Sequence, residues 1–404
     1  MTLLLFLLIL SLLVFVHEFG HFIMAKKAGI LVEEFGFGLP PRIWGKKVGE
    51  TTYSINALPI GGFVKLYGED GENGEEIKKI KEIKTIKNKN EKIIGRAFYE
   101  KSIPRRISVI LAGVTMNFLL AILVFSVVYY VSGIPTRTGN IKVVGLVEGS
   151  PAEIAGIEID DEILALNEEK LNKVETFIDL TKSMAGRVIS LEIKRAKAHP
   201  CQPDQPVFGG AIGPDFEANC RNGNLLLSLI PRENPPEGEG PLGVIISDVE
   251  MKRYSSWLMP FYGIREGLKE SFSWGKTIFV SLAGMVSGLL KGQVPRDVAG
   301  PIGIYQATGM VARSGFLAIL QFLGILSINL AIINILPFPA LDGGRLLFLG
   351  IEAFAGRKIT PKIEAVVNSL GMVFLLLLAL LITINDLARI FNANQILEKI
   401  KILF

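Results

Sequence analysis

The sequence predicts a polytopic α-helical membrane protein with four transmembrane helices, one extracytoplasmic α+β domain and a membrane-associated β-hairpin or sheet on the cytoplasmic side. Three observations support this fold class: half of the 404 residues are apolar, the mean hydropathy is +0.42, and four apolar runs approach the roughly 20 residues that cross a bilayer. Only 20% of the residues are charged and the net charge is +4, which excludes a disordered chain and gives no indication of nucleic-acid binding.

The four apolar runs divide the chain into spans and connecting segments. The first run lacks a basic n-region and a clear small-residue cleavage site, so we expect a retained helix and no signal peptide. A fifth run, Thr277 to Leu290, is short for a span and predicts an interfacial or partly buried helix with an amphipathic lead-in. The expected parts are a first span at 1–25, a cytoplasmic loop with a β-hairpin at 26–106, a second span at 107–132, an α+β domain at 133–235 with an inserted loop at 196–224, a segment with the amphipathic helix at 236–315, a third span at 316–342, a cytoplasmic connection at 343–362, a fourth span at 363–386 and a tail at 387–404.

The charges of the two large connections predict the orientation in the membrane. Residues 26–106 carry 17 Lys and Arg against 11 Asp and Glu, whereas residues 133–260 carry 13 against 19. Because Lys- and Arg-rich connections stay in the cytoplasm, we expect 26–106 and the short connection after the third span to be cytoplasmic. Residues 133–260 and both termini then lie outside.

The first span contains the pattern H-E-x-x-H, as His17-Glu18-Phe19-Gly20-His21. A spacing of four puts both imidazoles on one face of a helix, where they can bind one metal ion, and Glu18 lies beside them to take a proton from a water molecule. A chance match or a pair of core histidines is the alternative. Three adjacent ionisable groups in an apolar helix favour a functional site.

A catalytic zinc ion needs a third protein ligand and one open position. The only other histidine, His199, and both cysteines, Cys201 and Cys220, lie in the segment that we expect outside, whereas the first span carries its motif near the cytoplasmic end. We therefore expect a carboxylate at the cytoplasmic end of another span, and Asp342 at the end of the third span meets that condition. A helix-ending Asp-Gly turn is the alternative for this residue.

Two prolines, Pro337 and Pro339, precede Asp342 and must interrupt regular helix. Irregular backbone at membrane depth is tolerated only against protein or a wet cavity, so this break should line the site. Asn329 and Asn334 on the same segment could bond the backbone of a substrate there. Hydrogen bonding between helices is the alternative for both residues.

Further motifs accompany the two histidines and Asp342. They are Gly61-Gly-Phe-Val-Lys-Leu66, Gly113-x-x-x-Asn117, Arg296-Asp-Val-Ala-Gly-Pro-Ile-Gly303, and Asn334-Ile-Leu-Pro-x-Pro before Leu341-Asp342-Gly343. The combination resembles the site-2 proteases, which are intramembrane zinc metalloproteases, and in particular their bacterial regulator-of-sigma-E protease branch. The resemblance implies cleavage of single-pass membrane proteins, such as anti-sigma factors or signal-peptide remnants, within their transmembrane segment in the bacterial cytoplasmic (inner) membrane.

The cytoplasmic loop should supply a strand that binds substrate. Alternating apolar residues around Thr51–Ile55 and Gly62–Leu66 predict short strands in a hairpin. A helical substrate must unwind before it is cut, and an exposed strand edge could capture the extended segment by strand addition. An ordinary surface hairpin is the alternative. The residues to which the resemblance assigns substrate contacts are Gly61, Gly62, Phe63, Val64 and Asn117.

Residues 139–232 resemble one PDZ domain. The pattern consists of a strand at Ile141–Val147, a helix at about 174–185 and strands at 188–195 and 225–231. Its groove could bind a peptide or chain end, or the domain could act as a size filter over the active site. The inserted loop 196–224 contains Cys201 and Cys220, which could pair as a disulfide in an outside loop or remain free thiols.

These observations predict a zinc metalloendopeptidase of the site-2 type, with one catalytic Zn²⁺ held by His17, His21 and Asp342 and with Glu18 as the base. The expected partners are single-pass membrane proteins, the lipid bilayer and a peptide or chain end at the PDZ groove, without nucleic acid. A catalytically idle, PDZ-bearing membrane scaffold is the alternative. A metal transporter is disfavoured because one three-ligand site offers no relay of further ligands across the membrane.

Overall fold

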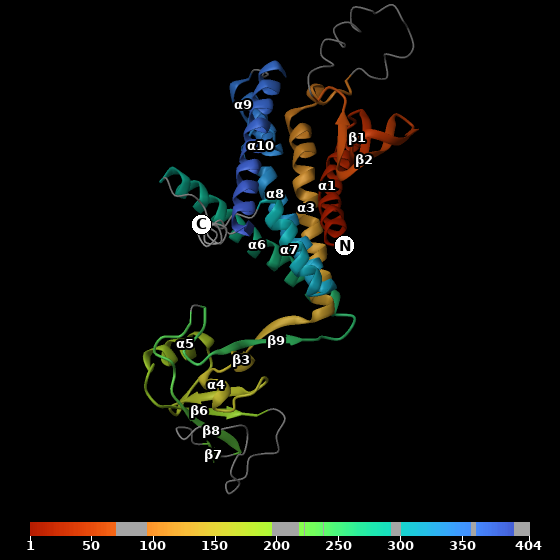
Figure 1. The fold of residues 1–404 in the computed structure, drawn as a ribbon. Helices are drawn as coiled ribbons and strands as arrows, with labels where there is room; N and C mark the ends of the chain where they lie inside the picture. Colours follow the sequence, from red (N-terminus) through yellow and green to blue (C-terminus); the bar gives the residue numbers. More distant parts are fainter. Residues whose placement is uncertain are drawn as a thin grey trace, which may run out of the picture. The chain divides into compact units, whose positions relative to one another are not determined.

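The computed structural model describes residues 1–69, 95–195, 218–221, 223–236, 238–291, 300–356 and 361–391 (Figure 1). The chain divides into two compact units, one made of Met1–Val131 with Ser256–Phe404 and the other of Ser132–Ser255. The first unit holds the long helices and a small sheet. The second unit is rich in strands.

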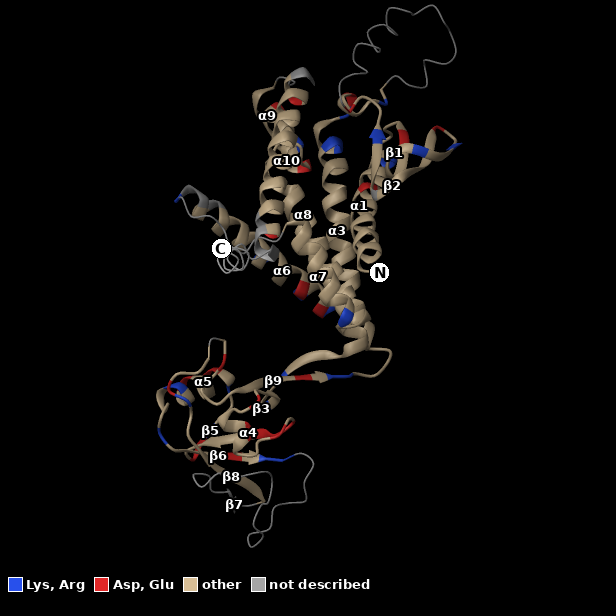
Figure 2. Ribbon diagram, viewed as in Figure 1, with Lys and Arg blue, Asp and Glu red and all other residues tan. Residues whose placement is uncertain are grey.

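Among the described residues of the first unit, four helices are long and apolar enough to cross a membrane. They are α1 (Thr2–Lys27), α3 (Ile103–Ser132), α8 (Phe316–Ile335) and the segment Ile363–Ile384 of α10 (Pro361–Phe391). Long stretches of these helices are tan in Figure 2, because Lys, Arg, Asp and Glu gather towards the helix ends. The four predicted spans are therefore confirmed as apolar helices, as expected for a membrane protein.

Apolar side chains and one glycine hold the first helices together. Ile9 and Leu13 of α1 form a buried cluster with Val124 of α3 and Leu323 of α8. Gly20 of α1 lies directly against α3, where a Cβ atom would be 2.4 Å from the carbonyl oxygen of Ala112. Only glycine permits this approach, which brings the polar turn of α1 against α3.

The third span ends earlier than the expected residue 342. Helix α8 stops at Ile335, because Pro337 and Pro339 follow and cannot continue it, and a separate helix α9 (Asp342–Ala355) begins at Asp342. Before α8 lie α6 (Met259–Leu290) and α7 (Pro301–Arg313). Helix α6 is continuous, so the expected amphipathic lead-in and the short apolar run after it form one element.

The small sheet consists of β1 (Val32–Val48) and β2 (Thr51–Leu66), two long bent strands that pair antiparallel. Residues 32–37 have a neighbour on each side, because Phe35 is paired with Tyr53 and also with Val64. Residues 62–66 consequently form an outer edge of the sheet. A short 3₁₀ helix, η1 (Phe98–Glu100), follows before α3.

Aromatic rings attach this sheet to α1. The ring of Phe35 lies 5.5 Å from that of Phe15, 6.2 Å from that of Phe19 and 4.9 Å from that of Phe22, measured between ring centroids. Phe15 and Phe22 flank the H-E-x-x-H turn of α1, and Phe19 lies within it. The sheet edge is thus positioned by the same helix turn that carries the two histidines.

The second unit is a seven-stranded antiparallel sheet with two short helices. Its strands run in the order β7-β8-β6-β4-β3-β9, and β5 pairs with β4. Alternating residues of β6 and β8 are fully buried, as expected for a sheet with one covered face. The elements are β3 (Ile134–Leu146), α4 (Pro151–Ile154), β4 (Glu162–Leu166), β5 (Glu169–Lys170), α5 (Val174–Ser183), β6 (Ile189–Lys194), β7 (Ala218–Arg221), β8 (Asn224–Leu229) and β9 (Val244–Lys252).

The secondary structure of this unit matches the elements that the sequence predicted for a PDZ domain, although the identity of the domain stays a prediction. The expected strands at 141–147, 188–195 and 225–231 and the helix near 174–185 are present as β3, β6, β8 and α5. Strand β9 was not predicted. Within the expected inserted loop, β7 is described, whereas residues 196–217 and 222 lie outside the described residues. His199 and Cys201 are among these undescribed residues, and the side chain of Cys220 is not described either. The pairing of Cys201 with Cys220 therefore stays a prediction.

Candidate functional site

The two histidines of α1 and the first residue of α9 converge on one point. His17 and His21 are one turn apart on α1 and both are buried. Their Nε2 atoms lie 3.2 Å apart, and Oδ2 of Asp342 lies 3.1 Å from Nε2 of His17 and 3.3 Å from Nε2 of His21. We expected these three side chains to meet from the sequence, and the structure brings them together.

The donor set fits a zinc ion. Nitrogen and oxygen ligands at about 2.0–2.1 Å from a tetrahedral ion lie about 3.3 Å from one another, which is close to the spacing of these three atoms. Oδ2 of Asp342 is buried and accepts no hydrogen bond, so it is an acceptor without a proton donor at the point on which both Nε2 atoms converge. Two histidines and one carboxylate leave a fourth position open, which is typical of catalytic zinc sites.

Two groups of helix α3 determine which tautomer each of the two imidazole rings adopts. Nδ1 of His21 lies 2.8 Å from the carbonyl oxygen of Val109, to which it donates, and this leaves Nε2 unprotonated for a metal. Nδ1 of His17 lies 3.2 Å from Nδ2 of Asn117. A 180° rotation of that amide presents Oδ1, which is buried without a partner, to the N–H of the ring. Both rings then have the tautomer that metal binding requires.

Asn117 consequently has a different place from the one expected. The resemblance assigned it a substrate contact, but its side chain is fully buried behind His17. The geometry therefore favours a positioning role for Asn117, because a side chain with no exposed surface offers nothing to a substrate. Gly113, in the same motif, lies against both rings. A Cβ atom there would be 2.4 Å from Nε2 of His21, so any larger residue would displace the ligand.

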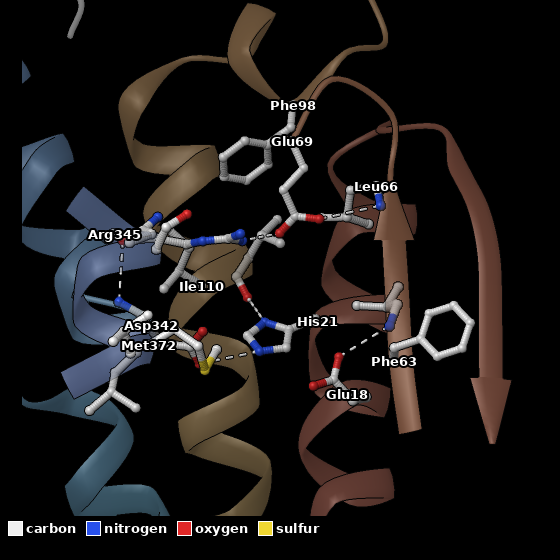
Figure 3. Close-up of a pocket in the computed structure, with 17 residues that line it drawn as sticks. Glu18, His21, Phe63, Leu66, Glu69, Phe98, Ile110, Asp342, Arg345 and Met372 are labelled. Atoms are coloured by element: carbon white, nitrogen blue, oxygen red, sulfur yellow. Dashed lines mark hydrogen bonds and ion pairs between the residues drawn. The ribbon is translucent and has the colours of Figure 1, made fainter. Parts of the chain in front are cut away.

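Glu18 points towards the sheet and not towards α3. Its Oε2 atom accepts a hydrogen bond of 3.2 Å from the amide of Val64 on the edge strand. Glu18, His21 and Asp342 together line a cavity of about 700 Å³, whose wall includes Phe63 and Val64 (Figure 3). A carboxylate beside the three converging donor atoms and next to open space has the position that a general base needs.

The remaining expected substrate residues lie at different distances from this cavity. Nδ2 of Asn334 is 3.3 Å from Nε2 of His17, so Asn334 reaches the centre. Asn329 lies more than one turn earlier on α8 and is not among the residues that line the cavity. Gly61 packs closely against Val14 of α1 and so permits this end of the edge strand to approach that helix, whereas Gly62 packs against the carbonyl oxygen of Gly36 on β1.

Two ion pairs near the site were not predicted. Arg106 of α3 donates to both carboxylate oxygens of Glu352 on α9, at 2.9 and 2.6 Å, and both side chains are largely buried. Arg345, one turn after Asp342, pairs with Glu69 just after β2. Charges that pair across such long sequence separations leave no local pattern.

Known proteins match the chain over nearly its whole length. The model of peptidase family M50 matches residues 5–378. The chain is 32% identical over 381 residues to a Clostridium perfringens protein named a zinc metalloprotease, covering 94% of this chain and 97% of the relative. It is 30% identical to the zinc metalloprotease RasP of Geobacillus kaustophilus, covering 96% and 97% of the two chains. It is also 30% identical to the regulator of sigma-W protease RasP of Bacillus subtilis, covering 96% and 99%.

Proposed function

We propose, from the premise that this chain belongs to peptidase family M50, that it hydrolyses peptide bonds within the transmembrane segments of single-pass membrane proteins. The chain is a zinc metalloprotease, and Zn²⁺ is its cofactor. One observation carries the proposal: the three converging donor atoms belong to helices of a unit whose spans are long and apolar enough for a membrane. A hydrolytic centre on such helices acts on chains that share the membrane.

The roles of the residues follow from their positions. We assign His17, His21 and Asp342 as the ligands that hold the zinc ion. Zinc, when bound, lowers the pKa of a water molecule and polarises the peptide carbonyl. Glu18 takes a proton from the attacking water on its carboxylate and passes it to the nitrogen of the leaving amine. Asn117 and the carbonyl oxygen of Val109 hold the histidine rings in the required tautomer.

The edge strand supports capture of substrate by strand addition. Within the described part of the chain, residues 62–66 pair with a strand on one side only, namely β1, and Phe63 and Val64 line the cavity beside Glu18. An extended segment placed along this edge would pass the base and the metal ligands. Main-chain hydrogen bonds along a strand recognise an unwound chain without demanding one side-chain sequence, which suits a protease of transmembrane segments.

The location and substrates follow from the charge pattern and from the relatives. We assign the protein to a bacterial cytoplasmic membrane, with residues 133–260 and both termini outside and the site near the cytoplasmic side. The Bacillus subtilis relative is named as a regulator of a sigma factor. Anti-sigma factors and signal-peptide remnants are accordingly the substrate classes that we propose. For the unit Ser132–Ser255 we propose a PDZ domain whose groove binds a chain end or whose bulk limits access.

Cleavage of a model single-pass segment by the wild-type protein and by Glu18→Gln, in liposomes, tests the proposal. Zinc is quantified in both samples. We expect the wild type to cut within the segment and Glu18→Gln to retain about one zinc ion per chain while it loses cleavage by at least about 100-fold, as expected when a general base is removed. Glu50→Gln is the matched control, because it removes a carboxylate from the same sheet away from the cavity.

Two results would contradict the assignment. If Glu18→Gln cut as fast as the wild type, Glu18 would not be the base. If the wild type held zinc but cut none of several unrelated segments, the idle scaffold would become the better explanation.

A further inference from the structure

The edge strand of the small sheet presents two backbone amides to the cavity. Residues 62–66 pair with β1 on one side, and their other side faces the cavity through Val64 and Leu66. Amides two residues apart on a strand point to the same edge. A chain added to this edge would therefore place its carbonyl oxygens on the amides of Val64 and Leu66.

Both amides are already occupied by carboxylates. The amide of Val64 donates to Oε2 of Glu18 at 3.2 Å, and the amide of Leu66 donates to Oε2 of Glu69 at 3.4 Å (Figure 3). Glu18 comes from α1 and Glu69 from the turn after β2, so two separate segments supply the acceptors. An added strand cannot bond these amides until the carboxylates leave them.

We propose that Glu18 and Glu69 mask the substrate-binding edge and that an incoming substrate strand displaces both carboxylates from the amides of Val64 and Leu66. This inference rests on the proposed strand addition and makes Glu69 a positioning residue for the reaction. Edge strands in soluble proteins are commonly protected by charged side chains. Here the protecting groups are the catalytic base and a carboxylate in the same cavity, so protection and catalysis use the same surface.

The surroundings of Glu69 lower the free-energy cost of moving its carboxylate away from the amide of Leu66. Its other oxygen, Oε1, pairs with the guanidinium of Arg345 on α9. When the amide of Leu66 turns to a substrate carbonyl, Glu69 keeps this charged partner and is not left as an unpaired charge near the membrane. Arg345 follows Asp342 by one helical turn, so the displaced carboxylate stays attached to the helix that supplies the third metal ligand.

The displacement of Glu18 has a consequence for catalysis. While Oε2 of Glu18 accepts from Val64, one lone pair of that oxygen is engaged and the carboxylate is held against the edge strand. A substrate carbonyl that takes over the amide of Val64 frees this oxygen at the moment when the scissile chain lies along the edge. Substrate capture thus prepares the base, and the resting protein holds it partly engaged.

Affinity for uncut substrate tests the proposal. The probe is a fluorescent single-pass segment that the wild type cleaves, reconstituted in liposomes with inactive, zinc-loaded variants, so that binding is measured without turnover. A Gln side chain keeps an oxygen that accepts from the amide, whereas Ala removes it. We expect Glu18→Ala to bind the segment about fivefold more tightly than Glu18→Gln, because one competing hydrogen bond is lost. In the Glu18→Gln background, Glu69→Ala should bind about fivefold more tightly than Glu69→Gln for the same reason.

The control and the contrary results are specific. Glu50→Ala in the Glu18→Gln background removes a carboxylate from the sheet without touching either amide and should leave the dissociation constant unchanged. Equal affinity of the Ala and Gln variants at both positions would overturn the proposal, because the carboxylates would then not compete with substrate. Weaker binding by the Ala variants would also overturn it.

Hydrogen exchange without substrate keeps this test separate from the proposed function. We expect the amides of Val64 and Leu66 to exchange faster in Glu18→Ala with Glu69→Ala than in the corresponding Gln variants, and this holds whether or not the protein cuts transmembrane segments. Unchanged exchange would show that the carboxylates do not mask the edge. Faster exchange together with a wild type that cuts no segment would instead contradict the proposed function and leave the masking intact.

Discussion

The two sheets of this protein are stabilised in opposite ways. In the strand-rich unit, every second residue of β6 and β8 is fully buried in a core of its own, with Ile189, Leu191 and Ile193 at 0% exposure. In the small sheet, large apolar side chains of the outer part are exposed, among them Ile43 at 71% and Trp44 at 52%. The sheet of the strand-rich unit has a core of its own, whereas the small sheet depends on α1.

The difference between the two sheets indicates which kind of sheet can carry a functional edge. A sheet with its own core has no need of a neighbour, and its residues are determined by packing. The small sheet keeps an edge open to the cavity because helix α1 supports its inner face through Phe15, Phe19 and Phe22. The support and the catalytic turn therefore come from one helix. Changes in the two sheets should have separable effects on cleavage.

The largest effect is expected where the small sheet rests on α1. Phe35→Ala removes the buried ring that joins three phenylalanines of that helix, which should destabilise the unit by about 3–5 kcal/mol and displace Val64 from Glu18. We expect at least a tenfold loss of cleavage with zinc retained. Thermal unfolding in detergent and the cleavage assay measure the two effects. Unchanged cleavage would contradict the claim that the small sheet depends on α1, because the edge would then keep its position without that support.

A second change addresses the self-supporting sheet. Leu191→Ala should destabilise the strand-rich unit by about 2–5 kcal/mol, because it opens a cavity in a filled core. Cleavage of a model segment with short flanks should stay within about twofold of wild type, since no described residue of Ser132–Ser255 lines the cavity at the metal ligands. Hydrogen exchange of β6 and β8 reports the destabilisation. A parallel fall in cleavage would show that the two units are coupled.

A smaller effect is expected at the turn between β1 and β2. Arg96 and Lys26 donate to Glu50 and lower the pKa of its carboxyl to about 2. Because the folded pKa is depressed, the stabilisation is present above the unfolded value near 4.3 and is lost as the pH falls towards 2. Glu50→Gln should therefore lower stability by about 0.2–1 kcal/mol at pH 7 and make no difference near pH 2. Unfolding midpoints of both proteins across this range measure the change, and a difference that grows at low pH would refute it.

The smallest effect is expected at the exposed part of the same sheet. Ile43→Ala truncates a side chain that is 71% exposed, so the midpoint of unfolding in detergent should change by less than about 0.5 kcal/mol. Leu191→Ala is the matched comparison, because both changes shorten an aliphatic residue on a strand. Equal destabilisation by the two changes would mean that the small sheet has a hidden core.

The sequence could predict the spans and the convergence of His17, His21 and Asp342 because both leave strong patterns. Apolar runs report membrane helices directly, and the H-E-x-x-H spacing places two histidines on one helix face. Asp342 was reachable by elimination, since charge asymmetry removed His199 and both cysteines from the same side. The resemblance to the site-2 proteases is confirmed by the match to peptidase family M50, and zinc by the names of the relatives.

The contacts between these elements could not be predicted. That Glu69 reaches the amide of Leu66 and Arg345 depends on how the backbone turns after β2. That Asn117 lies behind His17 depends on the rotation of α3 against α1, which Gly20 and Gly113 permit. Single side chains at tertiary contacts have no periodicity, so one sequence does not reveal them.

The wide separation of the proposed metal ligands along the chain has a consequence for biosynthesis. His17 and His21 lie on the first helix, whereas Asp342 begins the helix after the third span. A ribosome that has made the first two spans has released the proposed base and both imidazoles, but not the aspartate that we propose as the third ligand. The nascent protein therefore cannot assemble its hydrolytic centre until nearly all of it is synthesised and inserted. Late delivery of a single aspartate would keep the unfinished chain harmless to its membrane neighbours.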